Sequence, residues 1–194
     1  MMDEIIPKTR GLTPEEIKGA LEESTAPAVV KVTPKNTEPP VVPAPKPSYT
    51  ILDSGPGFLT IKTPAGQKTR YDGTISWRNN NPGNLVYGPL AASHGAFGKD
   101  YKGFAVFPDY ASGKAAYQDL LFNPNSSYYN LNIEDMLNKY APPSENNTKE
   151  YLNFILRTAK LNWSDRLKAL TEAQQEALMV AMFKYEGFQE GKVA

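Results

Sequence analysis

Apolar residues recur at helical spacing through the second half of the chain. The pattern predicts helices over 111–122, 132–141 and 146–159, a short helix over 164–170, and a longer one over 171–188. In the first of these, Ala115, Tyr117, Leu120 and Leu121 are expected to be buried. The prolines that follow residue 141 are expected to stop the second helix, because proline cannot continue a helical hydrogen-bond ladder.

The last predicted helix has the clearest start and stop signals. Thr171 can cap its first turn, and Gly187 can end it. Leu178, Met182 and Glu186 are spaced by four, so they lie on one face of the helix. Glu186 thus occupies the row that elsewhere carries core residues.

Alternating apolar and polar residues near the start of the main domain predict strands. Residues 49–72 are expected to form a small hairpin around the turn signal PAG at 64–66, and 104–109 (FAVFPD) another short strand. Together with the helices, this predicts an α+β domain, mainly helical, over 49–194.

The N-terminal part has a different pattern. Residues 13–23 predict a short capped helix within an N-terminal segment, 1–23, that we expect to dock on another protein. Residues 24–48 carry seven of the 17 prolines, which is typical of an extended linker. The predicted organisation is therefore a docking segment 1–23, a linker 24–48 and one folded domain 49–194.

Composition narrows the function. Lys plus Arg equals Asp plus Glu, 21 each, which argues against nucleic acid as a partner. The 194 residues include no cysteine and one histidine, His94, which we expect to be a plain loop residue. We therefore expect neither a metal nor a cofactor. The longest clean apolar run, 178–183, is too short for a membrane span, and the N-terminus lacks a secretory signal, so synthesis in the cytoplasm is expected.

The stretch SWRNNNPGNLVYG, residues 76–88, concentrates amide side chains. Asn-Pro-Gly-Asn favours a turn, and asparagine side chains often bond their own backbone. Amides also match sugar hydroxyl and N-acetyl groups, because they donate and accept hydrogen bonds. A turn and a ligand site are both compatible with the pattern.

Glu186 is the leading candidate for acid catalysis. Partial burial and the negative end of the helix dipole would both raise its pKa, which suits a general acid for glycosidic-bond cleavage. A solvated glutamate at a fraying helix end is the simpler interpretation. Asp100 or Asp109 is a possible second carboxylate, and Glu145 could support the next helix.

Four segments together resemble a known family. WRNNNPGNL, HGAFGKDYKGFAVFPDYASGKAA, YAPPSENNTKEYLNFI and AMFKYEGF are similar to lysozyme-like domains of bacteriophage virion proteins and of toxins from contractile secretion systems. PPSENNTKEY is also similar to the Glu-Thr-x-x-Tyr stretch of soluble lytic transglycosylases, where the catalytic glutamate comes earlier in the chain. The resemblance covers roughly 49–191 and implies a lysozyme-like fold in circularly permuted order.

The resemblance also implies roles for particular residues. Glu186 would be the general acid, and Glu145 would assist catalysis by orienting groups in the cleft. The expected substrate-binding residues are Arg78, Asn79, Asn81, Asn84 and Tyr87, from the asparagine-rich stretch, and Tyr140, from YAPPSENNTKEYLNFI.

The implied function is cleavage of peptidoglycan glycan strands between N-acetylmuramic acid and N-acetylglucosamine. Lytic transglycosylase and muramidase chemistry both remain open. The expected context is a phage virion or secretion machine, whose proteins would bind residues 1–48, with action in the periplasm or cell wall. An endolysin, a peptidoglycan-binding module without turnover, and a structural virion component are alternatives.

Overall fold

The computed structural model describes residues 48–144 and 146–194, all of which belong to one structural unit, Pro45–Ala194. The helix predicted at 13–23 and nearly all of the linker predicted at 24–48 lie outside the described residues, as does Glu145.

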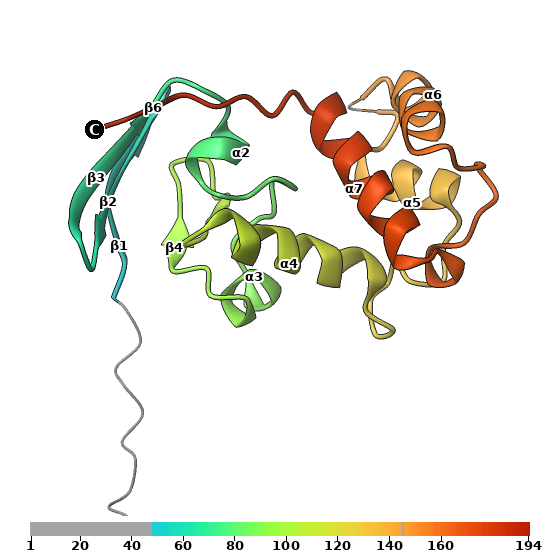
Figure 1. The fold of residues 1–194 in the computed structure, drawn as a ribbon, viewed down its shortest axis with the longest axis horizontal. Coiled ribbons are helices and arrows are strands. Elements are labelled where there is room, and N and C mark those ends of the chain that lie inside the picture. The colour runs from blue at the N-terminus through green and yellow to red at the C-terminus, as the bar shows by residue number, and fades with distance from the viewer. Residues whose placement is uncertain (1–47, 145) are drawn as a thin grey trace, which may run out of the picture. The chain divides into compact units, whose positions relative to one another are not determined.

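A small antiparallel sheet opens the described chain (Figure 1). It contains β1 (Thr50–Gly55), β2 (Phe58–Thr63), β3 (Gly66–Tyr71) and β6 (Lys192–Val193), in the order β1-β2-β3-β6. The predicted hairpin is thus three successive strands, joined by a fourth from the C-terminal end. A turn in which Gly57 has a φ of +84° separates β1 from β2, so the range 49–72 contains three strands where a hairpin has two.

Alternation along β2 decides which face of the sheet is covered. Leu59 and Ile61 are buried and cluster with Val106, whereas Lys62 between Ile61 and Thr63 is exposed. The sheet therefore packs one face on the short elements that follow it in the chain.

Four short elements lie between β3 and the first long helix in the order of the chain. They are α2 (Ile75–Arg78), α3 (Pro89–Ser93), β4 (Gly98–Lys99) and β5 (Ala105–Val106). The strand predicted at 104–109 is thus only two residues long and pairs with β4. Neither α2 nor α3 was expected, because four or five residues carry no readable helical period.

The long helices match the predictions closely. They are α4 (Tyr110–Phe122), α5 (Ile133–Tyr140), α6 (Thr148–Ala159) and α7 (Glu172–Tyr185). Each is capped by a side chain at its N-terminus, from Asp109, Asn132, Asn147 and Thr171, respectively. The short helix predicted at 164–170 is a single 3-10 turn, η1 (Leu167–Ala169).

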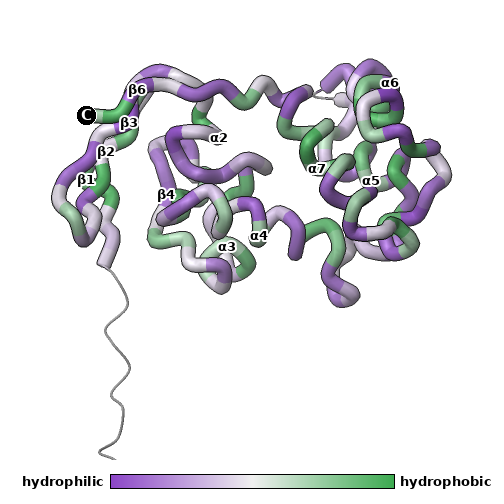
Figure 2. Tube along the Cα trace, in the orientation of Figure 1, coloured by the Kyte–Doolittle hydropathy of each residue, from purple (hydrophilic) through white to green (hydrophobic). Residues whose placement is uncertain are grey.

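The main core lies among these helices, along which hydrophobic and hydrophilic residues alternate (Figure 2). Tyr117, Ile155, Leu178 and Met182 are fully buried there. Ala115 was expected in this core but is exposed, because the inward face of α4 at this turn carries Ala116 instead. Burying that face of α4 fixes the asparagine-rich loop beside it.

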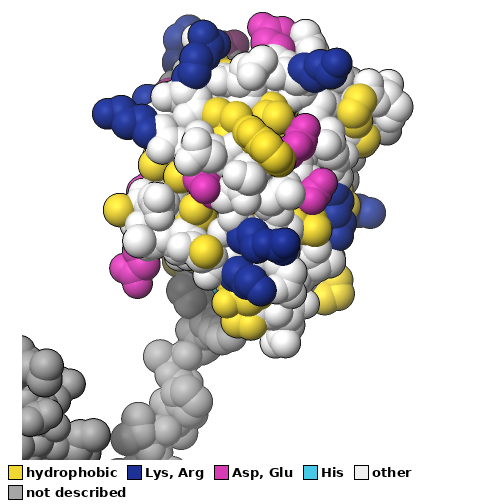
Figure 3. Space-filling model, turned by 90° about the vertical axis from the view of Figure 1, so that its right-hand side faces the viewer, with side chains coloured by type: hydrophobic (Ala, Val, Ile, Leu, Met, Phe, Trp, Pro, Cys, Tyr) yellow, Lys and Arg dark blue, Asp and Glu magenta, His cyan; other side chains and the backbone are white. Residues whose placement is uncertain are grey.

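The observed class is mixed α and β, with helices dominant over a four-stranded antiparallel sheet and a two-stranded one. Within the described ranges, none of the helices has the length and apolar character needed to cross a bilayer. On the face drawn in Figure 3, basic and acidic side chains are interspersed with uncharged ones, in line with the equal numbers of the two signs in the sequence.

Candidate active site

The C-terminal end of α7 positions Glu186. The helix begins with a capping box between Thr171 and Gln174 and ends with Glu186 as its C-cap. Gly187 follows in the left-handed conformation, with a φ of +73°. Its N–H bonds to the Lys184 carbonyl, and the next N–H bonds to that of Phe183, which is a Schellman ending. The predicted stop at Gly187 therefore fixes where the Glu186 side chain leaves the helix.

Three neutral groups donate hydrogen bonds to the Glu186 carboxyl. The hydroxyls of Tyr140 and Tyr151 each lie 3.0 Å from Oε1, and Nδ2 of Asn84 lies 3.0 Å from Oε2. These donors come from α5, α6 and the asparagine-rich loop, respectively. Glu186 forms none of the ion pairs found within residues 48–144 and 146–194. The carboxyl is thus held without any neutralising cation.

The Tyr140 hydroxyl has two partners but only one proton. It lies 3.0 Å from Oε1 of Glu186 and 3.0 Å from the carbonyl oxygen of Gly83. A carbonyl can only accept, so the two contacts are hydrogen bonds at once only when the Glu186 carboxyl is protonated and donates to Tyr140. When Glu186 is ionised, Tyr140 turns its proton to the carboxylate. The network therefore accommodates both protonation states of Glu186.

Burial raises the pKa of Glu186 above its ordinary value, and the hydrogen bonds from Tyr140, Tyr151 and Asn84 act in the opposite direction. The position of Glu186 at the negative end of the α7 dipole also disfavours the charged form. The same surroundings raise the pKa of Tyr140 and Tyr151, chiefly through burial and then through the negative charge of Glu186. Both tyrosines thus remain protonated donors.

Most of the asparagine-rich loop points into the protein. Nδ2 of Asn79 bonds to Oδ2 of Asp100 at 2.8 Å, and that of Asn80 to the Phe107 carbonyl at 3.0 Å. Asn81 is completely buried and bonds to three backbone groups, the N–H and carbonyl of Leu85 and the carbonyl of Ala105. The hydrogen bonds of these amides hold the loop against the segment around β5.

Arg78 is also turned inwards. It is 6% exposed and donates from one terminal nitrogen to the carbonyls of Asp72 and Gly73, both at 2.8 Å. Arg78, Asn79 and Asn81 were expected to touch substrate, but none of them lines the cavity that contains Glu186. The hydrogen bonds that they donate all go to groups within the protein, so we assign these residues to the construction of the loop.

Asn84 is the member of the stretch that reaches Glu186. It has a φ of +47°, in the left-handed region that asparagine tolerates better than most residues. That conformation ends the turn that Pro82 and Gly83 make and aims Nδ2 at the carboxyl. Its Oδ1 is buried and has no hydrogen-bond partner among the described residues. Asn84 therefore serves both interpretations of the stretch, because it ends the turn and also contacts the candidate catalytic carboxyl.

The remaining candidates have other places. Tyr87 is 40% exposed and does not line the Glu186 cavity. Asp100 and Asp109, expected as possible second carboxylates, accept backbone hydrogen bonds, Asp100 in its own loop and Asp109 as the cap of α4. His94 is more than a loop residue, because its Nε2 lies 3.0 Å from Oδ2 of Asp119.

Glu186, Asn84 and Tyr140 share a cavity of about 650 Å³. Further aromatic rings line it, from Phe104, Tyr128, Tyr151 and Tyr185. Asn146 adds a second amide, directly after Glu145 in the chain. The volume is within the range of about 300–1,000 Å³ typical of small-molecule sites.

Tyr151 is the main residue that the sequence did not single out as part of a site. It lies in the helix predicted over 146–159 and is 3% exposed. Its ring stacks on Tyr185 with centroids 3.9 Å apart, which places its hydroxyl on Glu186. The resemblance to the Glu-Thr-x-x-Tyr stretch was the signal that could have identified it.

No protein-family model matches this chain, and a search of curated proteins finds no match. Within the described part of the chain, no group of three or more histidine and acidic side chains could hold a metal ion.

Proposed function

We propose that the protein is a peptidoglycan-cleaving glycosidase, with a lysozyme-like domain, that uses Glu186 as general acid. The observation that carries the proposal is a half-buried carboxyl of raised pKa in a sizeable cavity, held by neutral donors alone. A carboxyl of raised pKa keeps its proton to a higher pH than an ordinary glutamate and can protonate the oxygen of a glycosidic bond as that bond breaks.

The cavity lining suits an amino sugar. Aromatic rings can cover the apolar faces of pyranose rings, and the amides of Asn84 and Asn146 can bond to hydroxyl or N-acetyl groups. The unpartnered Oδ1 of Asn84 is an acceptor within this site.

The two tyrosines support both halves of the reaction. Before proton transfer, Tyr140 can donate its own proton to the Gly83 carbonyl, so the proton of Glu186 can be directed to the glycosidic oxygen. After transfer, Tyr140 and Tyr151 can both donate to the new carboxylate. The site therefore stabilises the charge that forms on Glu186 without a cation.

Glu186 is the one acid among the described residues that line the cavity. This favours chemistry in which the substrate's own N-acetyl group assists departure of the leaving group. Glu186 would then take a proton back, either from the 6-hydroxyl of the muramoyl residue, which closes an anhydro ring, or from water. The first course is that of a lytic transglycosylase and the second that of a muramidase.

Mass analysis of the products tests the proposal. Purified peptidoglycan incubated with the full chain should release soluble muropeptides. Anhydro-muropeptides would identify a lytic transglycosylase, and reducing ends a muramidase. If no soluble fragments form but the protein sediments with the insoluble wall, the protein is a binding module and the proposal is wrong.

A further inference from the structure

A second hollow lies beside the Glu186 cavity and takes no part in the mechanism above. It has a volume of about 300 Å³ and is lined by Leu90, Asp119 and Leu120, together with side chains of the loop that follows α4. We call it the leucine pocket. Leu120 lines both hollows, so they share a wall.

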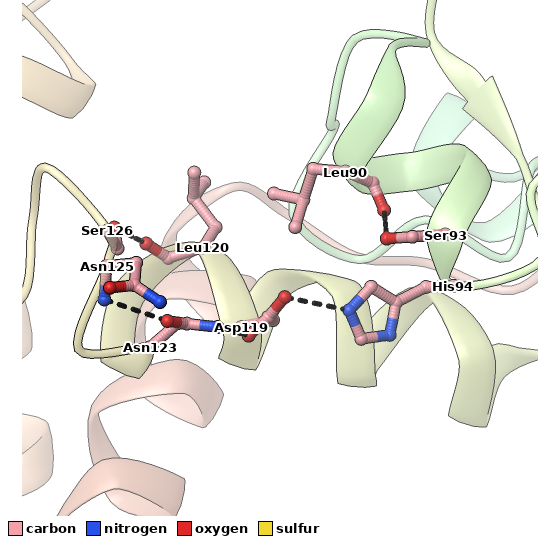
Figure 4. Close-up of polar contacts among 8 residues, drawn as sticks. All are labelled: Leu90, Ser93, His94, Asp119, Leu120, Asn123, Asn125 and Ser126. Carbon is pink, nitrogen blue, oxygen red and sulfur yellow. Dashed lines mark hydrogen bonds and ion pairs between the residues drawn. The ribbon is translucent and has the colours of Figure 1, made fainter.

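The leucine pocket has one apolar side and one polar side (Figure 4). Leu90, from α3, and Leu120, from α4, project toward the same space. Asn123, Asn125 and Ser126 lie on the polar side, where the Asn125 N–H bonds to Oδ1 of Asn123 at 2.8 Å and the Ser126 hydroxyl to the Leu120 carbonyl. The loop is therefore fixed in place by its own side chains.

His94 and Asp119 hold the two walls together. Nε2 of His94, at the end of α3, lies 3.0 Å from Oδ2 of Asp119 on α4. Nδ2 of Asn123 bonds to the other oxygen of Asp119. The hydrogen bonds from His94 and Asn123 lower the pKa of Asp119, so a negative charge stays at the edge of the pocket.

The two neighbouring hollows differ in chemistry. Five aromatic residues line the Glu186 cavity, whereas the leucine pocket has no aromatic lining residue. Flat rings suit pyranose faces. Branched aliphatic side chains beside amides and hydroxyls instead suit small alkyl side chains joined by peptide groups, which need both apolar contact and hydrogen bonds.

We propose that the leucine pocket binds the peptide stem carried by the glycan strand that the Glu186 cavity holds. The inference rests on the proposed function. In peptidoglycan the stem branches from the muramic acid residue itself, so a stem beside the scissile bond would meet the shared wall at Leu120. Asp119 offers a charge partner to a free amino group on the stem. The protein would thus act on peptide-bearing strands in preference to bare glycan.

Two substrates test the inference: intact peptidoglycan, and the same material freed of stems by an amidase. The full-length protein should release fragments from the intact material several-fold faster. Leu90→Ala should reduce the rate on intact strands about five-fold and leave the rate on bare glycan unchanged. A variant that is partly unfolded would lose rate on both substrates by the same factor, so the ratio of the two rates reports on the pocket alone.

Leu52→Ala is the matched control, because Leu52 is a half-exposed leucine on β1, outside the pocket. Asn125→Ala, on the polar side, provides a second variant and should also lower the ratio. Equal wild-type rates on the two substrates would overturn the inference, as would a preference that survives both pocket variants. If neither substrate is cleaved, the proposed function itself fails and the inference falls with it.

Discussion

Nδ2 of Asn84 donates a 3.0 Å hydrogen bond to Oε2 of Glu186 across 102 residues of the chain. This contact joins the end of the asparagine-rich loop to the end of the last helix. The neighbouring Asn79, Asn80 and Asn81 bond to the loop's own surroundings instead. One short stretch therefore contains both scaffold and site, and substitution can separate them.

Asn81→Ala should destabilise the fold, whereas Asn84→Ala should impair activity. The first leaves three buried backbone groups without their partner, which costs about 3 kcal/mol of unfolding free energy. The second should change that free energy by less than about 1 kcal/mol but slow peptidoglycan cleavage about ten-fold, since the carboxyl loses an orienting bond. Urea unfolding and an assay of released muropeptides measure the two effects. The reverse pattern would contradict the assignment.

Glu186→Gln should be more stable than the wild type at neutral pH. The folded protein holds Glu186 with a raised pKa, so its contribution to stability is complete below the ordinary glutamate pKa and is lost as the pH rises through the raised value. Glutamine carries no charge and avoids this loss. The melting temperature of the variant should therefore exceed that of the wild type by a margin that grows as the pH rises above about 4, until the pH passes the raised pKa of Glu186.

Glutamine can also keep the hydrogen bonds of the site. Its oxygen accepts from the two tyrosines, and a flipped Asn84 presents the currently unpartnered Oδ1 to its amide. A difference in melting temperature that shrinks as the pH rises would mean that Glu186 is not a buried acid of raised pKa.

Tyr151→Phe should shift the pH profile of activity upward. The Tyr151 hydroxyl donates to Oε1 of Glu186 and so favours the ionised carboxyl. Without that bond the pKa of Glu186 rises further, and the proton needed for catalysis is retained to higher pH. The alkaline limb of the rate profile should therefore move to higher pH. Tyr71→Phe, on exposed β3, is the control and should leave the limb in place.

The sequence predicted the long helices well because periodic apolar residues coincide with capping side chains there. The elements α2, α3 and β4 were not predicted, and the strand predicted at 104–109 was too long, since each element between β3 and α4 has only two to five residues. Tertiary hydrogen bonds such as those of Asn81 hold this part of the chain, and they have no local signal. The pairing of β6 with β3 is likewise a long-range contact that no pattern within 192–193 indicates.

For the site, a spacing of four from Leu178 and Met182 placed Glu186 correctly on the inward row of the last helix. The direction in which each asparagine side chain points could not be predicted. The same amide can form hydrogen bonds within a turn, with a buried backbone group or with a ligand. The role of Tyr151 could not be predicted for a related reason. A buried tyrosine on the apolar face of a helix cannot be distinguished from an ordinary core residue until the partner of its hydroxyl is known.

The most direct measurement is the rate at which Glu186→Gln releases soluble fragments from purified peptidoglycan, beside wild type and Glu190→Gln. Glu190 is an exposed glutamate four residues further along the chain. General acid catalysis predicts a loss of about 100-fold or more for Glu186→Gln, with its thermal unfolding transition retained, and no change for Glu190→Gln. A folded Glu186→Gln variant that releases fragments at more than half the wild-type rate would contradict the assignment of Glu186.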